Sequence, residues 1–246
     1  MNFHDFIASL TKEDLEKITR EFNKLKNEIP TYTFSQIEHK DLRKLFDIER
    51  IFDQKIFDSW FNFDIILTDE EVLFLTELLE QEIDLIRIYN EEDLKVHFVS
   101  PILNKVNFKS LKNKIRDFYE ETLIYETNDF IIKGITDFVV AKGLEYPEKP
   151  YFFIQEFKKG FQYSNPEPQL LAELISAVEL NDFKQMKGAF IIGENWNFVI
   201  LNKLDQNKYH YFISRTFNAT QINDLKCIYK NLLFIKHHFL SDSVQS

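Results

Sequence analysis

Three residues with chemically useful side chains stand on two apolar segments that are typical of strands. Residues 151–158 are mostly apolar but carry a carboxylate and an ammonium near their end, Glu156 and Lys158. Side chains two positions apart on a strand point to the same side, so these two groups face together. A lone carboxylate, Asp137, stands among apolar neighbours in residues 134–140, nineteen positions before Glu156. Two carboxylates and a lysine that converge on a sheet edge favour metal-dependent cleavage of phosphodiester bonds.

That chemistry assigns a role to each group. Hydrolysis of a phosphodiester needs an attacking water, charge stabilisation at phosphorus and a stabilised leaving oxygen, much of which Mg²⁺ supplies. Mg²⁺ takes oxygen ligands at roughly 2.0–2.1 Å, usually one or two carboxylates with waters and phosphate oxygens. We therefore expect Asp137 and Glu156 to bind Mg²⁺ or Mn²⁺, with the backbone carbonyl of Phe157 as a third ligand. Lys158 would position the attacking water or stabilise charge on the phosphate. The hypothesis requires both carboxylates on one face of the sheet, with oxygens about 3 Å apart.

The elements that must position these groups follow from hydrophobic spacing and cap signals. The predicted helices span residues 11–28, 34–62, 68–88, 91–104, 166–180 and 219–239. The predicted strands span residues 116–125, 128–133, 134–142, 151–157, 188–194, 196–203 and 208–214. Helices, a run of strands, a crossover helix, more strands and a final helix indicate an α/β or α+β fold.

Composition narrows the class of protein. The 246 residues are 44% hydrophobic and include 26 Phe, which supports a substantial core and argues against disorder. The single cysteine, Cys227, excludes an internal disulfide framework and a multi-thiolate zinc site. The six His show no metal-ligand spacing. There is no signal peptide and no apolar run of roughly 18 residues, so we expect a cytoplasmic protein with no membrane partner.

Charge divides the chain into two chemically different parts. The net charge is −10, which argues against tight, freestanding binding of nucleic acid. Residues 1–100 hold 12 Lys and Arg against 23 Asp and Glu, whereas residues 101–246 hold 18 against 17. Phosphates would therefore meet the second part. We predict an acidic helical N-terminal extension at residues 1–89, a surface for support or for a protein partner, and a catalytic domain at residues 90–246.

The catalytic pattern resembles a known superfamily. Gly134-x-x-Asp137, eighteen intervening residues and then Glu156-x-Lys158 on an apolar strand resemble the PD-(D/E)xK nucleases. The resemblance covers roughly residues 90–214. It implies a restriction-endonuclease-like fold, which is a mixed sheet flanked by helices in αβββαβ order.

Further positions extend the resemblance. Glu92, in the first turn of a predicted helix, resembles the acidic residue of the family's first core helix. Gln169 resembles the Gln of the lambda-exonuclease-like and RecB-like branches. Residues 188–198 look like the strand-turn-strand of type I restriction-subunit N-terminal domains. Two positions depart from the pattern: Thr136 replaces a Pro before the Asp, and Glu173 replaces a Tyr four residues after the Gln.

Each of these residues also has a purely structural interpretation. Asp137 would suit a strand end, and Glu156 with Lys158 would suit a solvated edge pair. Acidic residues at positions 91–93 suit the first turn of any helix, although residues 92, 96, 99, 103 and 106 form one stripe that places Glu92 on the buried face. Gln169 has the character of an exposed helical residue. Trp196, Phe198 and the Phe residues at 46, 52, 57, 61 and 63 are expected to pack in the core.

The sequence therefore predicts a Mg²⁺-dependent nuclease acting on DNA, in which Asp137 and Glu156 bind metal, Lys158 positions the nucleophile, and Glu92 and Gln169 assist. RNA remains open as a substrate. Two alternatives remain open as well: a nuclease fold used as a non-catalytic binding module, and a structural protein in which the pattern is a coincidence.

Overall fold

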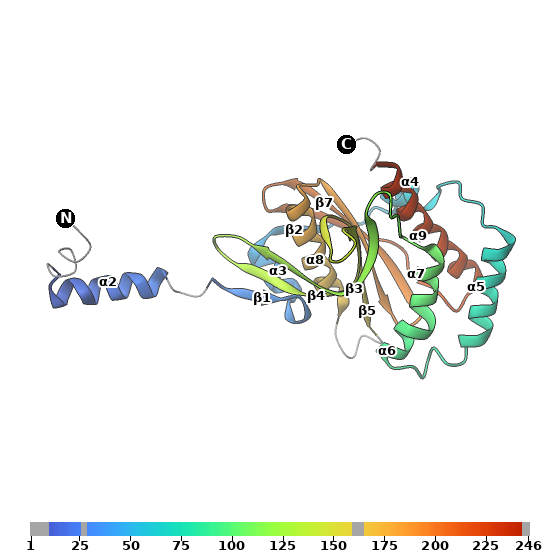
Figure 1. The fold of residues 1–246 in the computed structure, drawn as a ribbon, viewed down its shortest axis with the longest axis horizontal. Coiled ribbons are helices and arrows are strands. Elements are labelled where there is room, and N and C mark those ends of the chain that lie inside the picture. Colours follow the sequence, from blue (N-terminus) through green and yellow to red (C-terminus); the bar gives the residue numbers. More distant parts are fainter. Residues whose placement is uncertain (1–9, 26–28, 159–164, 243–246) are drawn as a thin grey trace.

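A mixed sheet with helices on both faces forms the body of the protein (Figure 1). The computed structural model describes residues 10–25, 29–158 and 165–242. Helix α2 (Lys12–Leu25) extends away from this body, at the left of Figure 1. The predicted class, a mixed sheet flanked by helices, is confirmed. Among the described residues, no helix has the length and apolar character needed to cross a membrane.

The sheet contains nine strands within the described residues. They are β1 (Thr31–Thr33), β2 (Asp47–Arg50), β3 (Ile115–Glu126), β4 (Ile131–Lys142), β5 (Glu148–Lys158), β6 (Gln185–Ile192), β7 (Asn195–Asp205), β8 (Lys208–Ile213) and β9 (Phe217–Asn218). Their order is β1-β4-β5-β6-β7-β8-β2, with β3 paired to β4 and β9 paired to β7. The pairs β1–β4, β5–β6 and β2–β8 are parallel, and the other pairs are antiparallel.

Each face of the sheet packs against its own helices and has its own apolar cluster. Side chains of α4 (Asp58–Phe61), α5 (Asp69–Glu82), α7 (Ser100–Val106) and α9 (Ile222–Asp242) belong to the cluster on one face. Side chains of α3 (His39–Leu45) and α8 (Pro166–Asn181) belong to the cluster on the other. Trp196 and Phe198 are fully buried in the first cluster, as the packing interpretation predicted.

The crossover helix α8 links the parallel strands β5 and β6. A helix pair ending at Val106 precedes β3, β4 and β5, and α8 and β6 follow them. This succession matches the predicted αβββαβ order. The Thr68 and Asn90 side chains cap the helices that follow them, because each accepts a hydrogen bond from the backbone N–H of the third residue of its helix.

The prediction of one helix over residues 34–62 is wrong. The segment contains 3-10 turns at Phe34–Gln36 and Gln54–Phe57, the short helices α3 and α4, and the strand β2. β2 pairs with β8 across a long sequence separation, from Asp47 opposite Lys208 to Arg50 opposite Tyr211. The local spacing of apolar residues cannot indicate a pairing partner so distant in the sequence. The division of the chain after residue 89 stays a prediction, although β1 and β2 both join the sheet of the later residues.

The Phe-rich part of that segment is only partly in the core. Phe46 and Phe57 are buried, and Phe61 packs against the core while it stays partly exposed. Phe52 is 85% exposed and Phe63 is 48% exposed, so the prediction that these two rings are core residues is wrong.

Candidate active site

The site lies where β4 and β5 separate. The two strands pair antiparallel as far as Phe138, which lies opposite Gln155. Beyond this pair, β5 continues along β6 to its last residue, Lys158. The Oδ2 atom of Asp137 accepts a hydrogen bond of 2.8 Å from the backbone N–H of Phe157. A carboxylate of β4 thus takes the place of a backbone carbonyl where the ladder between the two strands ends.

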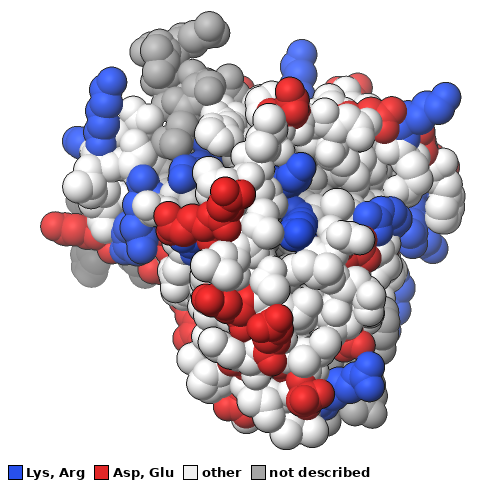
Figure 2. All heavy atoms as spheres, turned by 90° about the vertical axis from the view of Figure 1, so that its right-hand side faces the viewer, with Lys and Arg blue, Asp and Glu red and all other residues white. Residues whose placement is uncertain are grey.

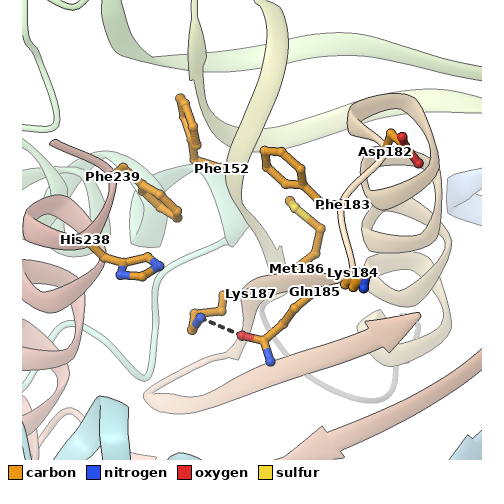
Figure 3. Close-up of a pocket in the computed structure, with 9 residues that line it drawn as sticks. All are labelled: Phe152, Asp182, Phe183, Lys184, Gln185, Met186, Lys187, His238 and Phe239. Carbon is orange, nitrogen blue, oxygen red and sulfur yellow. Dashed lines mark hydrogen bonds between the residues drawn. The ribbon is translucent and has the colours of Figure 1, made fainter. Parts of the chain in front are cut away.

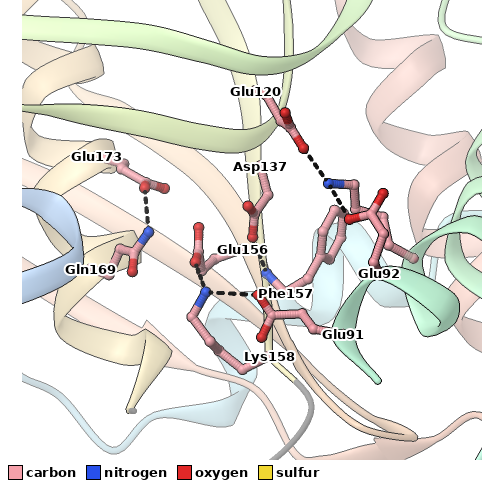
Figure 4. Close-up of polar contacts among 10 residues, drawn as sticks. Glu91, Glu92, Glu120, Asp137, Glu156, Phe157, Lys158, Gln169 and Glu173 are labelled. Carbon is pink, nitrogen blue, oxygen red and sulfur yellow. Dashed lines mark hydrogen bonds and ion pairs between the residues drawn. The ribbon is translucent and has the colours of Figure 1, made fainter. Parts of the chain in front are cut away.

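Asp137 and Glu156 lie on the same face of the sheet, as the metal hypothesis requires. Alternation along a strand puts Asp137 on the side of Val139, and Glu156 on the side of Ile154. Both of these apolar residues belong to the cluster that α8 covers. Figure 4 shows the two carboxyl groups next to each other, and the charge of Asp137 contributes to the raised pKa of Glu156. The two groups are therefore close enough to act together.

Glu156 is fully buried and lacks a partner for one of its oxygens. Its Oε1 atom accepts a hydrogen bond of 2.7 Å from Lys158 Nζ. Its Oε2 atom is buried and has no hydrogen-bond partner among the described residues. Burial, followed by the charge of Asp137, raises the pKa of Glu156 well above its ordinary value, and the nearby Lys158 only partly opposes this. Burial dominates because the carboxylate loses its hydration on all sides, whereas Lys158 contacts a single oxygen.

Lys158 is a protonated ammonium among carboxylates. Its side chain is 15% exposed, and Nζ lies 2.7 Å from Glu156 Oε1 and 3.5 Å from Glu91 Oε1. Burial alone would lower its pKa, but Glu156, Asp137 and Glu91 outweigh burial and raise the pKa to about 12. The predicted solvated edge pair is therefore excluded, because Glu156 is inaccessible and β5 is an interior strand.

Helix α8 brings two more polar side chains, Gln169 and Glu173, to this face. Asn165 begins the helix as its N-cap, and Pro166 occupies the first turn, where its missing N–H has no cost. Gly188 on β6 allows the helix to lie close to the sheet. An added Cβ there would lie 2.8 Å from the Ile154 carbonyl oxygen and 3.0 Å from Leu174 Cδ2. Close packing of α8 on the sheet therefore depends on a residue without a side chain at this position.

Gln169 is buried rather than an exposed helical residue, and it contacts Glu173. The Nε2 atom of Gln169 donates a hydrogen bond of 3.3 Å to Glu173 Oε1. Glu173 is fully buried, and its Oε2 atom has no hydrogen-bond partner in the described part of the chain. Burial, then Glu156 and Asp137, raise the pKa of Glu173 well above its ordinary value. Glu173 thus belongs to the site (Figure 4), and sequence reasoning treated it only as a departure from a family pattern.

The expectation that Glu92 faces the buried side is wrong. Its side chain is 67% exposed and pairs with Lys95, which also contacts Glu120. The neighbouring Glu91 approaches Lys158 instead (Figure 4). The stripe that included Glu92 assumed an unbroken α-helix. In the structure a π-helical turn separates α6 (Glu91–Leu94) from α7 and shifts the buried face by one residue.

The same π-helical turn accommodates Pro101. The turn spans Lys95–Val99. The backbone N–H of Ser100 donates a hydrogen bond to the Lys95 carbonyl at its end. Pro101 then lies in the first turn of α7, where no intrahelical N–H is required. The sequence signal for this break was the proline itself.

A metal ion at this site would need ligands beyond the side chains. Within the described residues, no three His, Cys, Asp or Glu side chains are arranged as a ready-made metal ligand set. Mg²⁺ usually binds one or two carboxylates and keeps several waters, so two carboxylates suffice. A strand residue points its N–H and its carbonyl to the same side. The Phe157 carbonyl therefore faces the same opening as the N–H that Asp137 accepts.

A separate cavity of about 360 Å³ lies away from these residues (Figure 3). Phe152, near the start of β5, lines it together with Phe183, Met186 and Phe239. Asp182 is the single carboxylate among the described residues that line it. The described lining of this mainly apolar cavity therefore offers no paired carboxylates for hydrolysis of a phosphodiester.

Neither a protein-family model nor a curated protein matches this chain.

Proposed function

We propose that this protein is a Mg²⁺- or Mn²⁺-dependent nuclease that hydrolyses phosphodiester bonds of DNA, with a restriction-endonuclease-like fold of the PD-(D/E)xK superfamily. One observation carries the proposal. Asp137 and Glu156 come from neighbouring strands and lie side by side on one face, and Lys158 Nζ is 2.7 Å from Glu156. The αβββαβ order of the elements around them supports the same superfamily.

The donor atoms fit a divalent cation that prefers oxygen. Glu156 Oε2 is buried and finds no hydrogen-bond partner among the described residues. A buried carboxylate oxygen without a partner is costly, and a cation would satisfy it. Asp137, Glu156 and the Phe157 carbonyl would hold the ion. When bound, such an ion stabilises charge on the phosphate and lowers the pKa of a bound water.

Lys158 acts in this proposal as a donor of hydrogen bonds and not as a base. Its pKa of about 12 keeps the amine protonated at neutral pH, and an ammonium offers three N–H donors and no acceptor. It would therefore orient the attacking water or bind a phosphate oxygen. Glu156 holds the ammonium on one side and Glu91 on the other, which fixes its position.

Charge favours an approach of DNA that avoids the helices of the N-terminal part. Figure 2 shows a band of acidic side chains across the face that contains α5, with basic side chains beside it. The first turn of α5 alone carries Asp69, Glu70 and Glu71. Such a band repels phosphates, so this face suits a protein partner better than nucleic acid. A cytoplasmic location, expected from the sequence, gives the enzyme access to DNA, and RNA remains a substrate to be compared.

A cleavage assay with metal controls tests the proposal. Linear duplex, circular duplex, single-stranded DNA and RNA would each be incubated with Mg²⁺, Mn²⁺ or EDTA. We expect cleavage of DNA with either metal and none with EDTA. Calorimetric titration with Mn²⁺ would accompany the assay. A protein that neither binds Mn²⁺ nor cleaves any substrate is a non-catalytic module, and the proposal is then wrong.

A further inference from the structure

Glu173 is a fully buried carboxylate that has no role in the reaction described above. Its Oε1 atom accepts a hydrogen bond from Gln169 Nε2, and its Oε2 atom has no partner among the described residues. No Lys, Arg or His within the described ranges forms an ion pair with it. An acidic residue on the buried face of an apolar helix therefore keeps one oxygen unsatisfied.

Folding alone gives no reason for this carboxylate. Glu173 lies close enough to Glu156 and Asp137 to be repelled by both, and Lys158 is the ammonium that faces the three acids among the described residues. Replacing a buried, incompletely paired charge with an apolar residue of similar size is often neutral or stabilising. The next residue of α8, Leu174, shows that the face between helix and sheet accepts such a side chain. The cost of Glu173 points to a ligand that the described residues do not supply.

The geometry also indicates how Glu173 would meet that ligand. Asp137, Glu156 and Glu173 do not form a direct three-residue ligand set. Mg²⁺ keeps several of its waters when it binds to proteins. Buried polar atoms without a protein partner are commonly satisfied by ordered water. A buried carboxylate near the direct ligands, with one oxygen unpartnered among the described residues, is therefore suited to hold a water of the hydrated ion.

We propose that Glu173 is an outer-sphere residue of the divalent-cation site, whose Oε2 atom accepts a hydrogen bond from a cation-bound water while Gln169 holds its Oε1 atom. This inference rests on the proposed cation site at Asp137 and Glu156. Glu173 is then a positioning residue, because it acts on the ion through water. Outer-sphere partners orient the groups that bind a metal directly, and their loss weakens affinity.

The first measurement is the Mn²⁺ dissociation constant of Glu173→Gln, by calorimetry on the full chain. The amide that replaces the carboxylate keeps the volume and the acceptor for Gln169 but removes the charge and the acceptor at Oε2. We expect affinity to fall roughly 10- to 100-fold. The matched control is Glu179→Gln, on the same helix. The Glu179 carboxylate lies away from the site and pairs with Lys203 Nζ at a distance of 2.9 Å. We expect the control to bind Mn²⁺ like the wild type.

The second measurement is the thermal unfolding midpoint of Glu173→Gln in EDTA. A purely structural role of Glu173 would lower this midpoint, whereas the proposed role predicts that it rises. Removal of a buried, repelled charge should raise the metal-free unfolding midpoint of Glu173→Gln above that of the wild type. Addition of Mn²⁺ should then raise the midpoint of the variant less than that of the wild type. If Glu173→Gln does not fold, Glu173→Met supplies the same comparison with an apolar side chain.

The outcomes separate this inference from the proposed function. Wild-type protein that binds no Mn²⁺ overturns the proposed function and the inference together. Wild-type binding with unchanged affinity in the Glu173 variants overturns only the role of Glu173. Weaker binding together with a lower metal-free midpoint also overturns it, because Glu173 would then be a structural residue.

Discussion

The backbone N–H of Phe157 donates a hydrogen bond of 2.8 Å to Asp137 Oδ2, so one carboxylate both joins two strands and faces the proposed cation. The hydrogen bond forms beyond the last ladder pair between β4 and β5, one residue past it on β4 and two residues past it on β5. Stability and metal affinity therefore depend on the same side chain. Two substitutions at this position can separate the two contributions.

Asp137→Asn should retain the fold and lose the metal, whereas Asp137→Ala should lose both the metal and part of the stability. Asn keeps an oxygen that accepts the Phe157 N–H, but it removes the charge. Ala leaves that N–H without its acceptor, which costs about 1–3 kcal/mol. Urea unfolding in EDTA measures the difference between the two variants. Equal stability of Asn and Ala variants would show that the hydrogen bond does not support the junction of the strands.

Sequence spacing located the central groups because strand alternation is a local property. Asp137, Glu156 and Lys158 could be placed on facing segments from the apolar residues around them alone. Gln169 could be placed at the start of a helix by Asn165 and Pro166. The prediction failed where partners distant in sequence decide the structure, as for the strand β2, which pairs with β8.

The two acidic residues outside that pattern show a second limit. Glu92 was placed on the buried face because the spacing assumed one continuous helix, and the π-helical turn over Lys95–Val99 changes which residues face inward. In the family pattern, the position of Glu173 is a tyrosine, so the pattern assigns no role to a carboxylate there. A single carboxylate among the apolar residues of a helix was the signal, and its burial depends on the packing of α8 against Gly188.

Metal binding should strengthen as pH rises. Burial and the charge of Asp137 raise the pKa of Glu156 above its ordinary 4.5. A folded-state pKa above the unfolded value stabilises the metal-free fold fully at pH below 4.5, and this contribution is lost as pH rises through the raised pKa. Mn²⁺ competes with the same proton, so the rise in unfolding midpoint that it causes should grow over that interval.

Thermal unfolding with EDTA or Mn²⁺, from about pH 5 to about pH 8, measures this linkage. Glu156→Gln is the control, because an amide does not titrate and should remove the pH dependence that Glu156 contributes. A metal-induced shift that is the same at every pH in the wild type would refute the competition between proton and cation.

Glu91 and Glu92 form a matched pair of substitutions on one helical turn. Glu91 Oε1 lies 3.5 Å from Lys158 Nζ, whereas Glu92 pairs with Lys95 at 3.3 Å. Glu91 is 44% exposed, so its ion pair with Lys158 is worth at most about 1 kcal/mol. Glu91→Gln should therefore slow cleavage up to about fivefold, and Glu92→Gln should leave the rate unchanged. Initial cleavage rates at identical metal concentrations measure this difference. A larger effect at Glu92 would restore the expectation from the sequence that Glu92 assists catalysis.

The most direct test of the central claim is DNA cleavage by Lys158→Ala in Mg²⁺ and in Mn²⁺. Lys203→Ala is the matched control, because Lys203 also pairs with a glutamate, at 2.9 Å from Glu179, but lies away from the site. Both variants should keep the circular dichroism spectrum of the folded protein. We expect Lys158→Ala to abolish metal-dependent cleavage while Lys203→Ala cleaves at the wild-type rate. Cleavage by Lys158→Ala at the wild-type rate would contradict the assignment of this site as the nuclease centre.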